Sequence, residues 1–122
     1  AKESGGSSVV VWGSGSPRRE FLHVDDLADA SVHLMRTYES PELVNVGVGT
    51  DVTIRELAET IRDVVGFTGE LSWDTSKPDG TPQKLLDVSR LSALGWQAKI
   101  GLRDGIEQTY AWYRGTLAER DR

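Results

Sequence analysis

The sequence predicts an α/β fold, in which short strands alternate with helices along the chain. Val9–Trp12 is a run of mostly β-branched residues that ends at glycine and serine, which is typical of a strand. Apolar residues recur at helical spacing over 27–38 and again over 54–65, which indicates two amphipathic helices. Thr53 begins a capping-box pattern that Glu56 completes, so the second helix has a clear start.

The first half of the chain contains two further strand predictions. Glu20–Val24 is expected to form an extended strand, after which Asp25 or Asp26 caps the first helix through its short acceptor side chain. Leu43–Val48 is predicted to be a strand that glycines end. Gly66 then ends the second helix.

The second half continues the alternation of strand and helix. A short strand over 70–73 precedes a polar loop over 74–82, which contains two prolines and a glycine. Residues 84–88 are expected to be extended, and a short helix follows from 89 to the glycine at 95. The last helix is expected to run from about Leu102 into the late teens, because apolar residues again recur at helical spacing.

Length and charge restrict the class of protein. With 122 residues, the chain is long enough for one domain with a core and too short for two ordinary domains. Its net charge of -5 argues against nonspecific binding to nucleic acid, which needs a basic face. No segment reaches the apolar length of a membrane span and no signal-peptide pattern opens the chain, so we expect a cytoplasmic protein without a membrane partner.

The chain also lacks the residues of common metal and redox sites. It contains no cysteine, which excludes disulfides, thiolate ligands and a cysteine nucleophile. The two histidines, His23 and His33, are too few and too far apart to suggest zinc, and both are expected to be structural or to face solvent. The sequence therefore predicts no metal site.

A polar cluster follows the first predicted strand and suits a nucleotide ligand. The indole of Trp12 can stack on a purine, and the guanidinium groups of Arg18 and Arg19 can bind diphosphate oxygens through paired hydrogen bonds. The alternative is an exposed pair of arginines on a turn, with Trp12 in the core at the end of its strand. Residue types alone leave both interpretations open.

A second polar cluster lies at 76–84. This loop carries the carboxylate of Asp79, the hydroxyl of Thr81 and the ammonium of Lys84, which together suit a polyhydroxylated ligand. A solvated connector between two strands is the alternative, since polar loops of this kind are common.

The chain contains no recognisable catalytic residues. Two glycine pairs, at 13–15 and 47–49, lack the third glycine of a dinucleotide-binding loop. The catalytic pair of a short-chain reductase needs a lysine four residues after a tyrosine. Tyr38, Tyr110 and Tyr113 are followed at that distance by other residues. We therefore expect neither catalysis nor cofactor binding from this chain alone.

Several motifs resemble one enzyme family. The sequences W-G-S-G-S-P-R-R-E-F-L-H-V-D-D, N-V-G-V-G, T-I-R-E-L-A and S-K-P-D-G-T-P-Q-K-L-L-D-V-S-R-L look like the C-terminal part of the GDP-L-fucose synthases. These enzymes are a branch of the extended short-chain dehydrogenase/reductases. The first motif is shared across extended short-chain reductases, whereas the K-P-D-G-T-P block is more particular to the GDP-fucose branch. The resemblance covers Val9 to Tyr113.

The resemblance implies a function for the parent enzyme. Such an enzyme converts GDP-4-keto-6-deoxy-D-mannose to GDP-L-fucose, by epimerisation at C3 and C5 and reduction of the C4 ketone with NADPH. Trp12, Arg19 and Asp79 match its substrate-contacting positions, and Lys84 is a further candidate. The family's catalytic residues and its NADP loop have no match in this chain, and its members are usually homodimers.

The resemblance also implies an incomplete architecture. Residues 1–122 correspond to a C-terminal, substrate-binding portion, with 1–8 as a remnant of a loop and the cofactor-binding Rossmann half absent. Segments 18–38 and 102–122 are expected to pack on that half, so the isolated chain is expected to associate with itself or with a separate N-terminal fragment. Alternatives are a UDP- or dTDP-sugar epimerase or dehydratase, and a noncatalytic binding module of the same fold.

Overall fold

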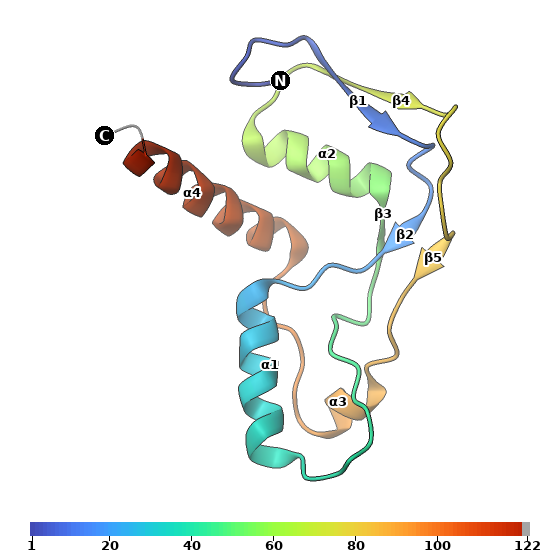
Figure 1. Ribbon diagram of the computed structural model, residues 1–122, viewed down its shortest axis with the longest axis vertical. Coiled ribbons are helices and arrows are strands. Elements are labelled where there is room, and N and C mark those ends of the chain that lie inside the picture. The colour runs from blue at the N-terminus through green and yellow to red at the C-terminus, as the bar shows by residue number, and fades with distance from the viewer. Residues whose placement is uncertain (121–122) are drawn as a thin grey trace.

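Short strands and helices are interspersed along the chain, as expected of an α/β fold. The computed structural model describes residues 1–120, with side chains described as far as 117 (Figure 1). The end of the predicted packing segment, residues 121–122, lies outside this range. In chain order the elements are β1 (Ser8–Trp12), β2 (Arg18–Arg19), α1 (Val24–Thr37), β3 (Val52–Thr53), α2 (Ile54–Val65), β4 (Glu70–Asp74), β5 (Gln83–Lys84), α3 (Ser89–Ala93) and α4 (Leu102–Arg120).

Two small sheets bring the polar loops together. β1 and β4 are parallel, with Trp12 opposite Asp74 at their carboxyl ends. β2 lies between β3, to which it is antiparallel, and β5, to which it is parallel. Because the carboxyl ends of parallel strands meet at one edge, the turn after β1 and the loop after β4 start side by side. Figure 1 shows the segments after β1 and β4 turning from this strand pair toward β2 and β5.

The core lies at the opposite end of the molecule, between α1 and α3 (Figure 1). Its buried apolar residues are Ala30, Leu91 and Trp96, surrounded by partly buried side chains such as Val44 and Val46. The indole N–H of Trp96 donates to Asp29 at 2.8 Å, which satisfies its only polar atom. Among the described side chains this core is small, and much of the apolar surface of the helices is left outside it.

The start of α1 differs from the sequence prediction. The strand expected over 20–24 is wrong: the strand in this region is Arg18–Arg19, residues 20–23 belong to no element, and the helix already begins at Val24. His23 is the N-cap, and its Nδ1 accepts from the backbone N–H of Asp25 at 3.2 Å. Neither aspartate that was expected to cap the helix does so. Asp26 is buried instead, and its carboxylate accepts the backbone N–H groups of residues 99 and 100.

Two other segments, one predicted as a strand and one as extended, contain little or no strand within residues 1–120. Leu43–Val48 forms no strand there, because its backbone pairs with no neighbour and Val44 and Val46 pack on the core. The carboxylate of Glu20 accepts the N–H groups of Val48 and Gly49 at 3.0 and 3.1 Å, and that of Leu86 at 2.8 Å. Side-chain hydrogen bonds therefore replace the ladder bonds of a strand in this region. The same holds for 84–88, where only Lys84, the last residue of β5, belongs to a strand.

The local signals around α2 are confirmed. Thr53 caps the helix, and Glu56 completes the box by accepting from the backbone N–H of Thr53 at 2.7 Å. Gly66 ends the helix with a φ of 67°, a conformation that favours glycine.

The helix surfaces only partly follow the predicted apolar faces. In α1, Ala30 is fully buried, whereas Leu27 is 47% and Met35 86% exposed. Within residues 1–120, no helix has both the length and the apolar character needed to cross a membrane.

Candidate functional site

The turn over residues 13–16 forms the centre of the polar surface, and several elements hold it. The N–H of Gly13 donates to the carbonyl of Asp74, at the end of β4, at 2.9 Å. Arg55, in the first turn of α2, donates from Nη2 to the carbonyl of Ser14 at 2.8 Å. These bonds fix the direction in which the chain leaves β1.

Trp12 lies beside this turn and faces solvent. Its side chain is 72% exposed, so the interpretation that placed it in the core is wrong. The ammonium of Lys77 lies 5.3 Å from the centre of its ring, in cation–π contact. By contrast, Trp73 is half-buried, with the guanidinium of Arg55 stacked 4.4 Å from its ring centre. An exposed indole at the edge of a polar loop is a suitable stacking surface for a planar ring.

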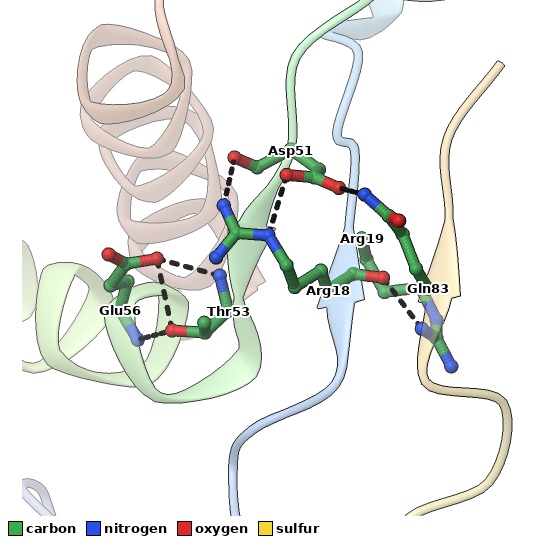
Figure 2. A network of polar contacts seen from close by, with 6 residues as sticks. All are labelled: Arg18, Arg19, Asp51, Thr53, Glu56 and Gln83. Carbon is green, nitrogen blue, oxygen red and sulfur yellow. Dashed lines mark hydrogen bonds and ion pairs between the residues drawn. The ribbon is translucent and has the colours of Figure 1, made fainter.

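The two adjacent arginines have different surroundings (Figure 2). Arg18 donates from Nε to Oδ1 of Asp51 at 2.8 Å, and Gln83 donates to the other carboxylate oxygen at 2.5 Å. Arg19 points to the opposite side of β2, where Nη1 donates to the carbonyl of Arg18 at 2.6 Å. Its Nη2 donates to the carbonyl of Thr81 at 2.7 Å. Arg18 is therefore neutralised by a carboxylate, whereas the contacts described for Arg19 are to neutral carbonyl groups.

Strand register places Lys84 beside Arg19. The two residues are direct partners in the parallel β2–β5 pair. Side chains at paired positions project from the same face of a sheet, with backbones about 4.8 Å apart. None of the ion pairs among the described residues involves either side chain. Two neighbouring cations outside the described ion pairs make this face locally positive on a chain whose net charge is -5.

Asp79 is directed at the turn rather than at this cationic face. Its Oδ1 accepts the backbone N–H of Ser14 at 2.6 Å, and its Oδ2 accepts the hydroxyl of Ser14 at 2.7 Å. These two hydrogen bonds, the backbone one first, hold the pKa of the Asp79 carboxyl below its usual value. Asp79 is therefore ionised at neutral pH and links the loop after β4 to the turn after β1.

The four residues singled out from the sequence thus form two connected groups. Trp12 and Asp79 flank the 13–16 turn, and Arg19 and Lys84 share a sheet face. The two groups are linked because the loop that carries Asp79 also supplies the carbonyl of Thr81 to Arg19. Sequence analysis missed the contacts made by Lys77 and Glu20.

The contacts of Asp51 and Gln83 could not be found in the sequence either. They depend on strand pairing between segments that are far apart in the chain. The pKa of Asp51 lies below its usual value, chiefly because Gln83 donates to it and then because of the bond and charge of Arg18. This network links β2, β5 and the residue before β3, and so secures the three-stranded sheet (Figure 2).

The described residues do not form a metal centre. No group of three or more histidine, cysteine or acidic side chains among residues 1–120 is arranged to hold an ion. The chemistry that this surface offers is stacking on an exposed indole and electrostatic binding of an anion.

Comparison with known proteins shows which enzymes this chain resembles. A model of the NAD dependent epimerase/dehydratase family matches residues 1–47. The chain is 61% identical to a putative GDP-L-fucose synthase 2 of Arabidopsis thaliana, over 98% of this chain and 37% of that protein. It is 54% identical to the GDP-L-fucose synthase of Escherichia coli K12, over 93% of this chain and 37% of the relative. The chain is thus similar to this family over residues 1–47, and to GDP-L-fucose synthases over nearly its whole length.

A solved structure shows the same resemblance. A GDP-L-fucose synthetase from Naegleria fowleri bound to NADP matches with a TM-score of 0.89 and 30% identity, over 96% of this chain and 37% of that chain. The resemblance to the GDP-L-fucose synthase branch and the extended short-chain reductase fold are therefore confirmed. The chain spans little more than a third of the length of the curated relatives it matches.

Proposed function

We propose that this chain is the C-terminal, GDP-sugar-binding portion of a GDP-L-fucose synthase. The whole enzyme converts GDP-4-keto-6-deoxy-D-mannose to GDP-L-fucose by 3,5-epimerisation and NADPH-dependent reduction at C4. The identity of 61% to a protein of that name supports the assignment. The arrangement of Trp12, Arg19 and Lys84 supports the role of this portion in substrate binding.

The pairing of Arg19 with Lys84 on one sheet face is the observation that carries the proposal. A diphosphate presents several charged oxygens, which an arginine can bind in pairs and a lysine as a point charge. Arg19 retains N–H groups beyond the two that contact carbonyls, because a guanidinium has five. Trp12 stacks on the base. Asp79 belongs to the site because its loop contacts both the 13–16 turn and Arg19.

The cofactor is assigned to the other part of the enzyme. NADP supplies the hydride for reduction of the ketone, and the N. fowleri relative was solved with NADP bound. This 122-residue sequence contains neither a complete dinucleotide glycine loop nor a tyrosine followed four residues later by a lysine. We therefore infer that the chain alone is inactive, and that the parent enzyme is a cytoplasmic homodimer, as the family resemblance implies.

The exposed apolar helix surfaces suit contact with the cofactor-binding half. Val24 is 69%, Met35 86% and Trp112 70% exposed. Val24 also lines a groove of about 540 Å³, formed mainly by apolar residues of α2, α4 and the segment before α1. We propose that segments 18–38 and 102–122 pack on the Rossmann half, which would cover part of this surface.

A calorimetric titration of the chain with GDP tests the proposed function, with UDP as the competing base. We expect saturable binding of GDP and a much weaker response to UDP. In this titration Arg36→Ala is the matched control for Arg19→Ala, because Arg36 is an exposed arginine on α1 away from β2. Equal binding of GDP and UDP would indicate a diphosphate site that does not read the base and would favour the UDP- or dTDP-sugar alternative.

Absence of binding to either nucleotide would contradict a substrate site within these residues. The reading frame in the source genome distinguishes the proposed enzyme portion from the noncatalytic binding module. A frame that begins near Ala1 would favour a binding module, whereas an upstream segment with a glycine-rich loop and a Tyr-x-x-x-Lys pair would reject it.

A further inference from the structure

The loop over residues 75–82 is held in a defined position by its own hydrogen bonds. Asp74 starts it with a tight turn, in which its Oδ1 accepts the N–H and hydroxyl of Ser76 at 3.1 and 2.5 Å. The carbonyl of Asp74 accepts the N–H of Lys77 at 3.2 Å. Farther along, Asp79 binds Ser14 through both carboxylate oxygens. The loop is thus tied to β4 at its start and to the 13–16 turn in its middle.

Two side chains of the proposed binding surface depend on this position. Lys77, two residues before Asp79, places its ammonium over the ring of Trp12. Thr81, two residues after Asp79, offers its carbonyl to Nη2 of Arg19. The two hydrogen bonds between Asp79 and Ser14 act as a tether for the loop. This tether lies midway between the loop's contact with the indole and its contact with the guanidinium.

Gly13 makes the close approach of Asp79 possible. A Cβ at this position would lie 2.5 Å from Oδ1 of Asp79, and the φ of Gly13 is 87°. Both the backbone conformation and the space require a residue without a side chain. The turn is shaped to receive the carboxylate, which is an observation independent of the hydrogen bonds themselves.

We propose that Asp79 is a positioning residue, which holds the 75–82 loop against the 13–16 turn so that Trp12 and Arg19 keep the orientation that binds the nucleotide diphosphate. The inference rests on the proposed function, because it concerns the same surface. A carboxylate that contacted the diphosphate directly would repel it. Bound to two donors of Ser14, the Asp79 charge instead stabilises the loop on which the cationic face depends.

A double-mutant cycle on GDP affinity tests the assignment. Asp79→Ala removes both bonds, and Ser14→Ala removes the hydroxyl bond alone. We expect Asp79→Ala to weaken GDP binding about tenfold and Ser14→Ala by less, with the double variant no worse than Asp79→Ala. If the affinity loss of the double variant equalled the product of the two single losses, the proposal would be overturned, since Asp79 would then act independently of Ser14.

Asp79→Asn separates a tether from a ligand contact that needs the charge. The asparagine amide can accept from the N–H of Ser14 and donate to its hydroxyl, so the tether survives without the charge. We expect this variant to retain GDP affinity within about twofold of the unchanged chain, as additivity errors in such cycles allow. A loss equal to that of Asp79→Ala would contradict the proposal. Glu59→Ala, at an exposed position on α2, controls for removal of a carboxylate.

Hydrogen exchange of the loop provides a readout that needs no ligand. Amides of 75–82 should exchange faster in Ser14→Ala and Asp79→Ala than in the unchanged chain, and α3 should not change. Unchanged exchange in the loop would reject the tether whether or not GDP binds. Faster exchange in a chain that binds no GDP would instead reject the proposed function and leave the tether intact.

Discussion

Arg18 and Asp51 form an ion pair of 2.8 Å. This pair distinguishes Arg18 from the next residue, Arg19, which makes no ion pair among the described residues. Asp51 is nearly buried, with 8% of its side chain exposed, and its second oxygen accepts from Gln83. The pair connects β2 to the residue before β3 and, through Gln83, to β5. The described contacts of the neighbouring Arg19 are to neutral carbonyl groups, and the proposed function assigns the ligand to this second arginine.

Replacement of either arginine should therefore give a different result. Arg19→Ala should weaken diphosphate binding by roughly 1.5–3 kcal/mol, the usual contribution of a charge-assisted hydrogen bond. In the enzyme completed by its cofactor-binding half, KM should rise more than kcat falls, because the diphosphate is bound equally throughout the reaction. A fall in kcat with unchanged KM would contradict this role. Arg18→Ala should mainly lower the thermal midpoint.

The Asp51 network should also affect the pH dependence of stability. The pKa of Asp51 is lowered in the folded state, first by Gln83, so the ionised carboxylate favours folding. Its contribution is fully present above the pKa of an unfolded aspartate and is lost as pH falls through the folded pKa. Asp51→Asn should therefore lose stability at neutral pH and show a flatter acid limb than the unchanged chain. Chemical unfolding from pH 2 to pH 7 measures this, with Glu59→Gln as control.

The capping box of α2 should contribute measurably to folding. Thr53→Ala removes the acceptor of the Glu56 N–H, a bond of 3.0 Å, and is expected to cost about 1 kcal/mol of unfolding free energy. Thr60→Ala is the matched control, because the Thr60 hydroxyl only returns to the carbonyl of Glu56 within the helix. Equal destabilisation by the two variants in urea unfolding would argue against a special role for the cap.

The small core should make stability sensitive to a single leucine. Leu91, a residue of α3, is 1% exposed, so Leu91→Ala is expected to cost about 2–5 kcal/mol. Leu43 is 92% exposed, and Leu43→Ala is expected to stay within about 0.5 kcal/mol of the unchanged chain. Calorimetric melting of both variants tests whether folding depends on this core.

The exposed apolar surface should make the chain associate. Met35 and Trp112 are 86% and 70% exposed on α1 and α4. We expect light scattering to show species above the monomer mass of 13.4 kDa, and expect Met35→Lys with Trp112→Lys to shift the distribution toward the monomer. A monodisperse monomer that binds no apolar dye would contradict the expectation, as would association unaffected by the two lysines.

Local signals in the sequence predicted some elements well. Thr53, Glu56 and Gly66 determine the start and end of α2 through bonds and dihedral angles within a few residues of each other. The strand expected over 43–48 failed because its alternating valines pack on Trp96 and its neighbours, and a strand requires a partner that local sequence cannot supply. His23 was overlooked as a cap because aspartate is the commoner N-cap residue.

The sequence by itself determined the α/β class, the resemblance to GDP-L-fucose synthases and the residue types suited to a nucleotide diphosphate, because these depend on local patterns and short motifs. Only the tertiary structure decided the role of each residue. It paired Arg18 with Asp51, placed Lys84 beside Arg19 and directed Asp79 at Ser14. Each of these relationships joins segments at least 30 residues apart, and such distant contacts are set by strand register and loop position rather than by neighbouring residues.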